Sequence, residues 1–126
     1  MASIESRGPR QMVLALRYSW QGLRAAWRFE SSFRLEVWLC LPLLPLALWL
    51  GATPVERALL SGSLLLVLAA ELLNGAVEAI VDKTTPEYNE LAGRSKDMGS
   101  AAVFICMLNV IAVWGLLLGP RLAGIG

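Results

Sequence analysis

Between Ala58 and Val81 the chain reads Ala58-Leu-Leu-Ser-Gly-Ser-Leu-Leu-Leu-Val-Leu-Ala-Ala-Glu71-Leu-Leu-Asn74-Gly-Ala-Val-Glu78-Ala-Ile-Val81, and this stretch decides the fold. It exceeds the roughly 20 apolar residues that a helix needs to cross a bilayer, yet it contains two carboxylates and an amide. These three polar side chains are spaced three and four positions apart, so in a helix they share one face. A carboxylate that faces lipid is costly, and such groups normally face a bundle interior, a partner or water. We therefore interpret 57–81 as a membrane span with a functional polar face.

Two further apolar runs flank this span. The run at 30–50 begins with Glu30, Arg34 and Glu36, and it is long enough to span if these charged turns lie at headgroup level. Glu30 and Arg34 are also spaced to pair. The run at 98–118 contains no charge, and 82–97 is a polar connection. We expect an all-α membrane protein with transmembrane helices at 30–50, 57–81 and 98–118.

The residues before the first span have the pattern of an amphipathic helix over 10–29. Apolar side chains recur there at spacings of three and four, which places them on one stripe: Val13, Leu16, Trp20, Leu23 and Trp27. Basic side chains lie along one flank, where they can extend to lipid phosphates: Arg10, Arg17, Arg24 and Arg28. We expect this helix to lie in the membrane interface, since no soluble core follows on which it could pack.

Composition supports a single membrane domain and excludes several other classes. Of the 126 residues 56% are hydrophobic, and the mean hydropathy is +0.59. A net charge of +1 gives no basis for nucleic-acid binding. Histidine is absent, so any acid, base or metal chemistry must use other side chains. Cys40 and Cys106 lie inside apolar runs and are expected to be free. Residues 1–28 lack the uninterrupted apolar region of a cleavable signal peptide.

The distribution of basic residues predicts the topology. Nine of the eleven Lys and Arg residues fall before Val37 or within 82–97, and only Arg57 and Arg121 lie on the other side. The positive-inside rule then places the N-terminal arm and 82–97 in the cytoplasm and the C-terminus outside.

The polar face of 57–81 has more than one possible use. Glu71, Asn74 and Glu78 suit an inter-helix hydrogen-bond cluster that holds an oligomer together, or the proton or cation path of a channel or transporter subunit. Alternatively, Glu30 and Glu78 meet at the cytoplasmic boundary, where two carboxylates form an oxygen-ligand pair for a Mg²⁺ ion that also holds substrate phosphates.

The polar connection offers a phosphate site. Arg94 and Lys96 stand where the third span is expected to begin, beside the free backbone N–H groups of a helix N-terminus. The chain contains neither a Walker-type nor a kinase-type glycine loop. A nucleotide bound here would therefore be held in a different way, and ordinary anchoring of a cytoplasmic loop is the alternative role for these two residues.

Four separate polar motifs resemble those of the bacterial integral-membrane diacylglycerol kinases, in order and in spacing, from about residue 11 to residue 118. They are Tyr18-Ser-Trp-Gln-Gly-Leu-Arg-Ala-Ala-Trp27, Glu71-Leu-Leu-Asn-Gly-Ala-Val-Glu-Ala-Ile-Val-Asp82, Glu87-Tyr88 and Gly93-Arg-Ser-Lys-Asp-Met-Gly-Ser-Ala-Ala-Val103. The resemblance implies a homotrimer in the bacterial inner membrane that transfers the γ-phosphoryl of MgATP to diacylglycerol and so produces phosphatidate. Similar folds in the wider family act on undecaprenol, which is the alternative acceptor.

The resemblance also implies roles for individual residues. Glu71 matches the catalytic base and Asn74 its neighbour, while Glu30 and Glu78 match the carboxylates that hold Mg²⁺ with ATP. Other positions match the nucleotide contacts, namely Tyr18, Glu87, Tyr88, Asn89, Lys96 and Asp97. The positions that match the lipid-substrate surroundings lie within 15–20, 25–28 and 32–37, with single positions elsewhere. They include Gln11, Ala15, Tyr18, Ser19, Trp20, Ala25, Arg28, Ser32, Arg34, Arg57, Glu71 and Ser100.

Two positions depart from the family pattern. Gln11 stands where the family often has Arg, and Asn89 stands where it often has His. We expect both departures to alter substrate affinity more than chemistry.

Overall fold

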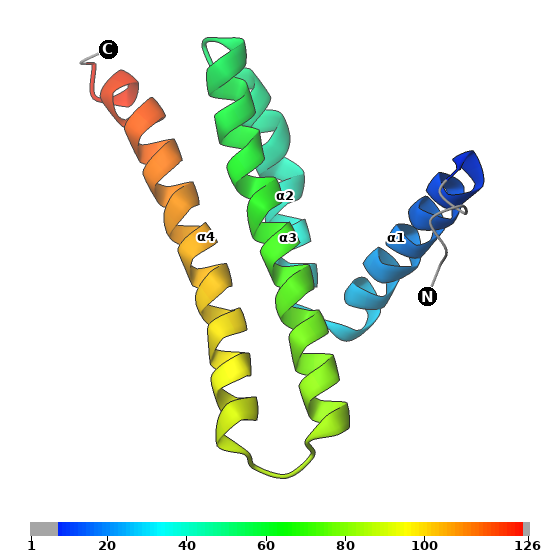
Figure 1. The fold of residues 1–126 in the computed structure, drawn as a ribbon. Coiled ribbons are helices and arrows are strands. Elements are labelled where there is room, and N and C mark those ends of the chain that lie inside the picture. Colours follow the sequence, from blue (N-terminus) through cyan, green and yellow to red (C-terminus); the bar gives the residue numbers. More distant parts are fainter. Residues whose placement is uncertain (1–7, 125–126) are drawn as a thin grey trace.

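The computed structural model describes residues 8–124, and within this range the chain forms four α-helices (Figure 1). They are α1 (Pro9–Phe29), α2 (Ser31–Leu50), α3 (Pro54–Thr84) and α4 (Glu90–Leu122). The prediction of an all-α protein is confirmed. Of the helices described, α2, α3 and α4 are long and apolar enough to cross a membrane.

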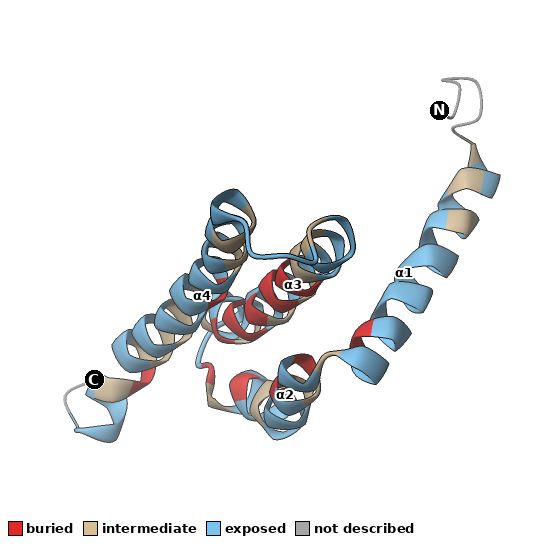
Figure 2. Ribbon diagram, turned by 90° about the horizontal axis from the view of Figure 1, so that it is seen from below, coloured by how far each residue is buried: buried red, intermediate tan, exposed pale blue. Residues whose placement is uncertain are grey.

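Helix α1 stands apart from the other helices and is almost entirely exposed (Figure 2). It ends where Glu30 adopts an extended backbone conformation, with φ −110° and ψ 104°. The guanidinium of Arg34 donates to the carbonyl oxygens of Trp27 at 2.8 Å and Arg28 at 3.1 Å. These carbonyls lie in the last turn of α1 and have no partner within the helix. Arg34 therefore fixes the corner between α1 and α2.

This use of Arg34 replaces the ion pair that the spacing predicted. Among residues 8–124 no salt bridge joins Glu30 to Arg34. Glu30 is the N-cap residue of α2, and its carbonyl accepts the Arg34 backbone N–H at 3.2 Å. The two side chains diverge, because that of Glu30 lies against Gly75 of α3 and that of Arg34 binds the end of α1.

Helix α3 lies between α2 and α4 and contacts both. Near one end of the three helices, Ala47 of α2, Leu60 of α3 and Leu118 of α4 pack together as a buried apolar cluster. Helix α2 runs through Pro42 and Pro45 without interruption.

The link between α3 and α4 is shorter than the sequence pattern predicts. We expected a polar connection over 82–97, but α3 continues to Thr84 and α4 begins at Glu90, so 85–89 alone lies outside helices in this part of the described chain. Polar residues can continue a helix beyond its apolar span, because the backbone hydrogen bonds are satisfied within the helix whatever its side chains.

A polar contact inside the bundle ties α4 to α3. The indole Nε1 of Trp114 donates to the carbonyl oxygen of Leu60 and to the hydroxyl of Ser63, both at 3.3 Å. Ser63 is buried, and its own hydroxyl donates to the Leu60 carbonyl at 2.8 Å. This contact fixes the rotation of α4 about its axis at the level of the apolar cluster.

We predict that Trp114→Phe destabilises the fold by about 1 kcal/mol, the typical net contribution of a hydrogen bond. The change keeps an aromatic ring but removes the donor. Unfolding in mixed detergent micelles with increasing dodecyl sulfate measures the loss. Trp49→Phe is the matched control, because Trp49 is 78% exposed near the same end of the bundle. Equal losses in the two variants would contradict a role for the Nε1 contact.

Candidate active site

The polar face of α3 is arranged as its spacing predicts. Glu71 is 7% exposed and Asn74 is 9% exposed, whereas Glu78 is half-buried. The Asn74 side-chain amide donates to Glu78 Oε1 at 3.4 Å. The face therefore runs from a buried carboxylate, through a buried amide, to a partly accessible carboxylate near the α3–α4 connection.

Helix α2 places a second carboxylate against Glu71. Glu36 is 7% exposed, and its carboxyl lies close to the Glu71 carboxyl. Glu36 Oε2 is buried and accepts no hydrogen bond from an amide or hydroxyl of the described residues. The two carboxyl groups therefore form a buried polar contact between α2 and α3.

The burial of Glu36 was not expected from the sequence. Sequence reasoning grouped Glu36 with Glu30 and Arg34 as charged turns before the apolar run. The structure buries it, because Glu36 faces α3 at the depth of Glu71. The sequence did contain a signal for Glu36, because a carboxylate at any position of a candidate membrane span indicates a functional site.

Glu30 reaches α3 from the corner between α1 and α2. A Cβ atom built on Gly75 would lie 3.2 Å from Glu30 Cδ and 3.3 Å from Glu30 Oε1, so the Glu30 side chain rests against the α3 backbone. Gly75 directly follows Asn74 and lies one helical turn before Glu78. Glu30 is thus brought to the segment of α3 that carries Asn74 and Glu78.

The beginning of α4 completes the site on the other side of α3. Lys96 Nζ forms a hydrogen-bonded ion pair with Asp82 Oδ1 at 2.9 Å, which joins residues 14 positions apart. Both side chains are substantially exposed, at 41% and 65%. Sequence reasoning did not assign Asp82 a role. Lys96 is held at the open end of the α3 polar face, within reach of solvent.

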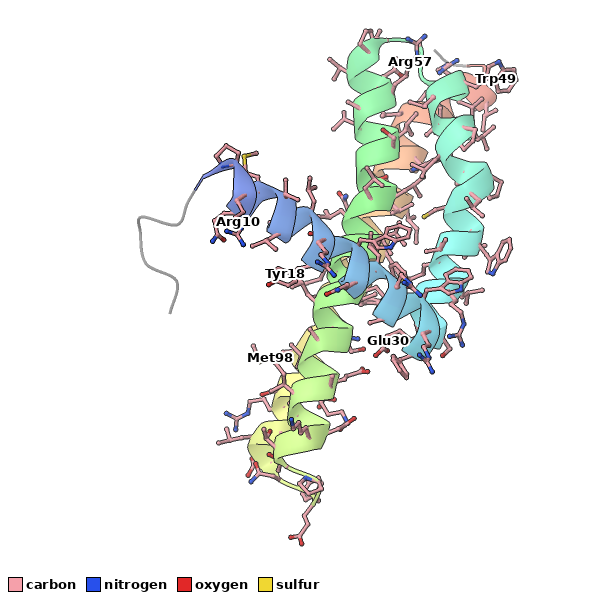
Figure 3. All side chains as sticks on the ribbon, turned by 90° about the vertical axis from the view of Figure 1, so that its right-hand side faces the viewer. Arg10, Tyr18, Glu30, Trp49, Arg57 and Met98 are labelled. Atoms are coloured by element: carbon pink, nitrogen blue, oxygen red, sulfur yellow. The ribbon has the colours of Figure 1, made fainter. Side chains whose placement is uncertain are left out.

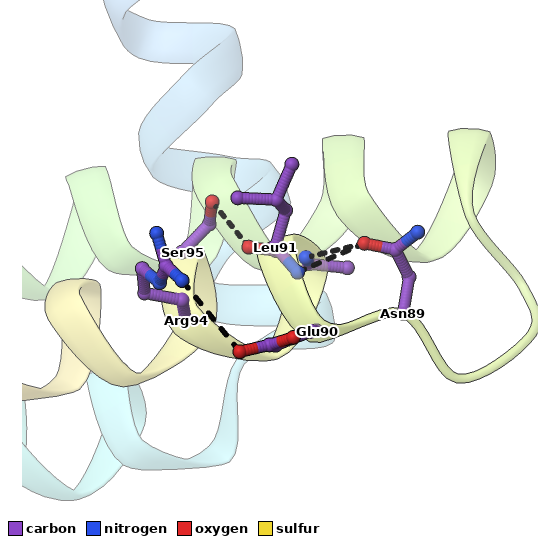
Figure 4. Close-up of polar contacts among 6 residues, drawn as sticks. Asn89, Glu90, Leu91, Arg94 and Ser95 are labelled. Atoms are coloured by element: carbon purple, nitrogen blue, oxygen red, sulfur yellow. Dashed lines mark hydrogen bonds and ion pairs between the residues drawn. The ribbon is translucent and has the colours of Figure 1, made fainter.

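Asn89 has a defined structural role at the start of α4 (Figure 4). Its Oδ1 accepts hydrogen bonds from the backbone N–H of Leu91 at 2.9 Å and of Ala92 at 3.2 Å, as an N-cap residue does. The helix N-terminus therefore lies at 89–92. Our expectation of free N–H groups beside Arg94 and Lys96 is wrong, because α4 begins before them. Arg94 instead pairs with Glu90 at 3.7 Å on the exposed surface.

Several predicted substrate positions line cavities beside α1. One cavity of about 990 Å³ lies between α1 and α2 and is largely apolar. Its lining includes four predicted positions, Trp20, Ala25, Arg28 and Arg34. A second cavity of about 630 Å³ lies between α1 and α3, and it brings Ser19 and Ala25 to the same space as Glu30 and Gly75. Apolar space thus adjoins the Glu30 side of the site.

Other predicted positions lie elsewhere on the helices, and Figure 3 shows Arg57 at the end of α3 opposite the α3–α4 connection. Arg57 stands near the start of α3, about 21 Å along the helix from Glu71 at 1.5 Å per residue, and its Nε donates to the Gly51 carbonyl. Tyr18 is 64% exposed on α1, and Tyr88 is 93% exposed in the α3–α4 connection. Gln11 is half-buried on α1. The remaining predicted positions are exposed on the helices or the connection: Ala15, Ser32, Glu87, Asp97 and Ser100.

The fold and the site together define an α-helical membrane protein with a buried carboxylate and amide cluster between its spans. The sequence profile described as prokaryotic diacylglycerol kinase matches residues 17–118. This chain belongs to the prokaryotic diacylglycerol kinase family. The resemblance carried by the four motifs is confirmed.

Individual relatives agree over most of their length. The chain is 46% identical to a diacylglycerol kinase of Escherichia coli strain K12 over 108 residues, which cover 86% of this chain and 88% of the relative. It is 46% identical to a diacylglycerol kinase of Haemophilus influenzae over 111 residues, covering 88% and 94%. A Pseudomonas aeruginosa diacylglycerol kinase is 40% identical over 111 residues, covering 88% and 90%.

We predict that Asn89→Ala frays the first turn of α4. Loss of an N-cap side chain typically costs about 1 kcal/mol of helix stability, so the amide hydrogens of Leu91 and Ala92 should exchange faster by about fivefold. Hydrogen exchange without nucleotide measures this effect apart from any binding role. Asn89→Asp is the control, because it keeps the acceptor oxygen. Unchanged exchange at both amides in Asn89→Ala would contradict the cap.

Proposed function

We propose that this protein is a membrane-embedded diacylglycerol kinase, which transfers the γ-phosphoryl group of MgATP to the free hydroxyl of diacylglycerol and so produces phosphatidate. The observation that carries the proposal is Glu71, a carboxylate buried on a membrane-spanning helix beside Glu36 in a chain of this family. The family match favours a lipid kinase over a channel or transporter subunit, because the named relatives are kinases.

On the acceptor side, Glu71 acts as the general base. It accepts the proton of the diacylglycerol hydroxyl as that oxygen attacks the γ-phosphorus of ATP, while the bond from the γ-phosphorus to the bridging oxygen breaks and ADP leaves. Packing against α2 beside Glu36 restricts the Glu71 carboxyl, and the low exposure of both groups keeps bulk water from competing as acceptor. The apolar cavities beside α1 accommodate acyl chains, with Trp20 and Arg28 toward the headgroup level.

On the donor side, Glu30 and Glu78 would hold the metal ion together with ATP. Mg²⁺ usually binds through one or two carboxylates and completes its coordination with phosphates and water. Glu30 rests against the α3 backbone at Gly75, one helical turn before Glu78, so two carboxylates are available on this part of α3. Bound Mg²⁺ would neutralise phosphate charge and align the γ-phosphoryl group. Asn74 supports Glu78 through its amide donor.

Lys96 supplies the positive charge of the chain itself. In phosphoryl transfer the protein acts mainly by positioning and by neutralising charge on the transferred group. The ion pair with Asp82 keeps the Lys96 side chain directed along the end of α3, where Glu78 lies one turn away. Nucleotide phosphate would share Lys96 with Asp82. Tyr18, Glu87, Tyr88, Asn89 and Asp97 are proposed to contact the nucleotide around this centre.

The proposed setting is the bacterial inner membrane, with α1 in the cytoplasmic interface and the α3–α4 connection on the same side. The excess of Lys and Arg there supports this topology. We also propose a homotrimer. Its support is the resemblance of the motifs within 18–27, 71–82 and 93–103 to the family.

The proposal is tested by transfer of ³²P from labelled ATP to diacylglycerol in mixed micelles. We predict that Glu71→Gln abolishes transfer and leaves the protein folded, because glutamine matches the size of glutamate but accepts no proton. Glu56→Gln is the matched control, since Glu56 lies near the opposite end of the same helix. Retained transfer in Glu71→Gln would remove Glu71 as the base. Transfer to undecaprenol but not to diacylglycerol would contradict the proposed substrate.

We predict that Glu78→Ala raises the Mg²⁺ concentration needed for half-maximal activity by about tenfold or more, because it removes one of two proposed carboxylate ligands. A Mg²⁺ titration at fixed ATP measures the change. Glu90→Ala is the control, since Glu90 is an exposed acid of α4 paired only with Arg94. An unchanged titration curve in Glu78→Ala would argue against the metal role.

A further inference from the structure

Two glycines give proposed site residues the space in which they lie. Gly75 lies on α3 directly under the Glu30 side chain. A Cβ at this position would come within 3.2 to 3.3 Å of Glu30 Cγ, Cδ and Oε1, which is closer than ordinary contact. The absence of a side chain at Gly75 therefore lets the Glu30 carboxyl approach the α3 backbone next to Asn74.

Gly99 gives the same kind of space to Asn74, from α4. A Cβ at Gly99 would overlap Asn74 Oδ1 and would lie 3.3 Å from Asn74 Cγ. Asn74 Oδ1 is itself buried and has no hydrogen-bond partner among the described residues. The Asn74 amide is therefore held on its oxygen side by close packing against Gly99 and on its nitrogen side by the hydrogen bond to Glu78 Oε1.

Other glycines of the same helices have no such neighbours. A Cβ built at Gly62 of α3 or at Gly115 of α4 would meet no atom of the rest of the chain within 4 Å. Glycine weakens a helix relative to alanine by about 1 kcal/mol. The close approach of neighbouring side chains at 75 and 99 is a reason for glycine to be retained at those two positions.

We propose that Gly75 and Gly99 are positioning residues of the kinase: Gly75 sets the place of the Glu30 carboxyl, and Gly99 fixes the orientation of the Asn74 amide toward Glu78. This inference rests on the proposed roles of Glu30 and Asn74. Glycine sets the separation of α3 from its neighbours at the two points where the Glu30 and Asn74 side chains are placed.

The two positions have different consequences. At Gly75 the nearest atoms belong to the end of a flexible side chain, so Gly75→Ala displaces the Glu30 carboxyl by a few tenths of an ångström. Mg²⁺ demands near-ideal ligand geometry, so this shift acts on metal dependence. At Gly99 the displaced amide is buried, and it must rotate away from Glu78. Gly99→Ala therefore acts on the rate of transfer.

The first arm of the test follows Asn74 directly. The chain contains three asparagines, Asn74, Asn89 and Asn109, so selective ¹⁵N labelling of asparagine gives a small set of side-chain amide resonances in micelles. Gly99→Ala should shift the Asn74 resonance and leave those of Asn89 and Asn109 in place. Gly115→Ala is the control and should shift none of them. An Asn74 resonance unmoved by Gly99→Ala would overturn the proposal at this position.

The second arm measures kinetics. Gly99→Ala should lower kcat by about tenfold or more with little change in the KM for ATP, since small misplacements of a site group have effects of this size. The double variant Gly99→Ala with Asn74→Ser should be no slower than Asn74→Ser alone, because serine removes the atoms that the new methyl group would meet. Additive losses would mean that Gly99 acts through general packing and would overturn the proposal.

Gly75→Ala should raise the Mg²⁺ concentration for half-maximal activity by about threefold or more and change kcat less. Gly62→Ala, on the same helix, should leave both unchanged. Equal effects of the two variants would overturn the role of Gly75. If Gly99→Ala alone fails to fold, the double variant with Asn74→Ser should fold, and its failure would also count against the proposal.

Failure of this inference can be told from failure of the proposed function. Asn74→Ala tests the role of Asn74 itself. Full activity in Asn74→Ala would remove that role and the inference with it. Loss of activity in Asn74→Ala together with an unaffected Gly99→Ala would overturn the inference alone and leave the proposed site standing.

Discussion

The close approach of the buried Glu36 and Glu71 carboxyls is the constraint on which the arrangement of the spans depends. Each carboxyl lies in a helix that is apolar enough to cross a membrane, and neither can face hydrocarbon without a large cost in free energy. The cost is reduced when α2 and α3 present the two groups to each other, away from lipid. The rotation of both helices about their axes is thereby tied to the same point.

The rest of the site is positioned around this contact by individual side-chain hydrogen bonds and ion pairs. Arg34 closes the end of α1 and sets the corner at which Glu30 turns toward α3. Trp114 fixes α4 against α3 at one end of the bundle, and the ion pair of Lys96 with Asp82 joins the same helices at the other. Together they leave the polar face of α3 open toward the α3–α4 connection, where a water-soluble nucleotide would arrive.

This arrangement explains how a kinase of this family works without a glycine-rich phosphate loop. The groups proposed to handle phosphate lie at the ends of helices that are already fixed by their crossing of the membrane. The N-terminus of α4 is occupied by the Asn89 side chain, so the proposed phosphate contact is the Lys96 side chain, and the proposed metal ligands are carboxylates. Depth orders the chemistry: the proposed base is buried, and the proposed metal ligands are nearer to solvent.

The sequence by itself determined the class of the protein, the number of apolar spans and the face shared by Glu71, Asn74 and Glu78. These follow from hydropathy and helical periodicity, which are properties of neighbouring residues in one chain segment. It did not determine that Glu36 is buried against Glu71, that Arg34 binds the end of α1, that α4 begins at Glu90, or that Gly75 and Gly99 make room for site side chains. Each of these depends on which face one helix presents to another, and periodicity within a single helix contains no information about its neighbour's rotation or depth. Only the tertiary structure decides them. Most are contacts between segments far apart in the sequence, and the start of α4 follows from the Asn89 cap, which lies outside the apolar run.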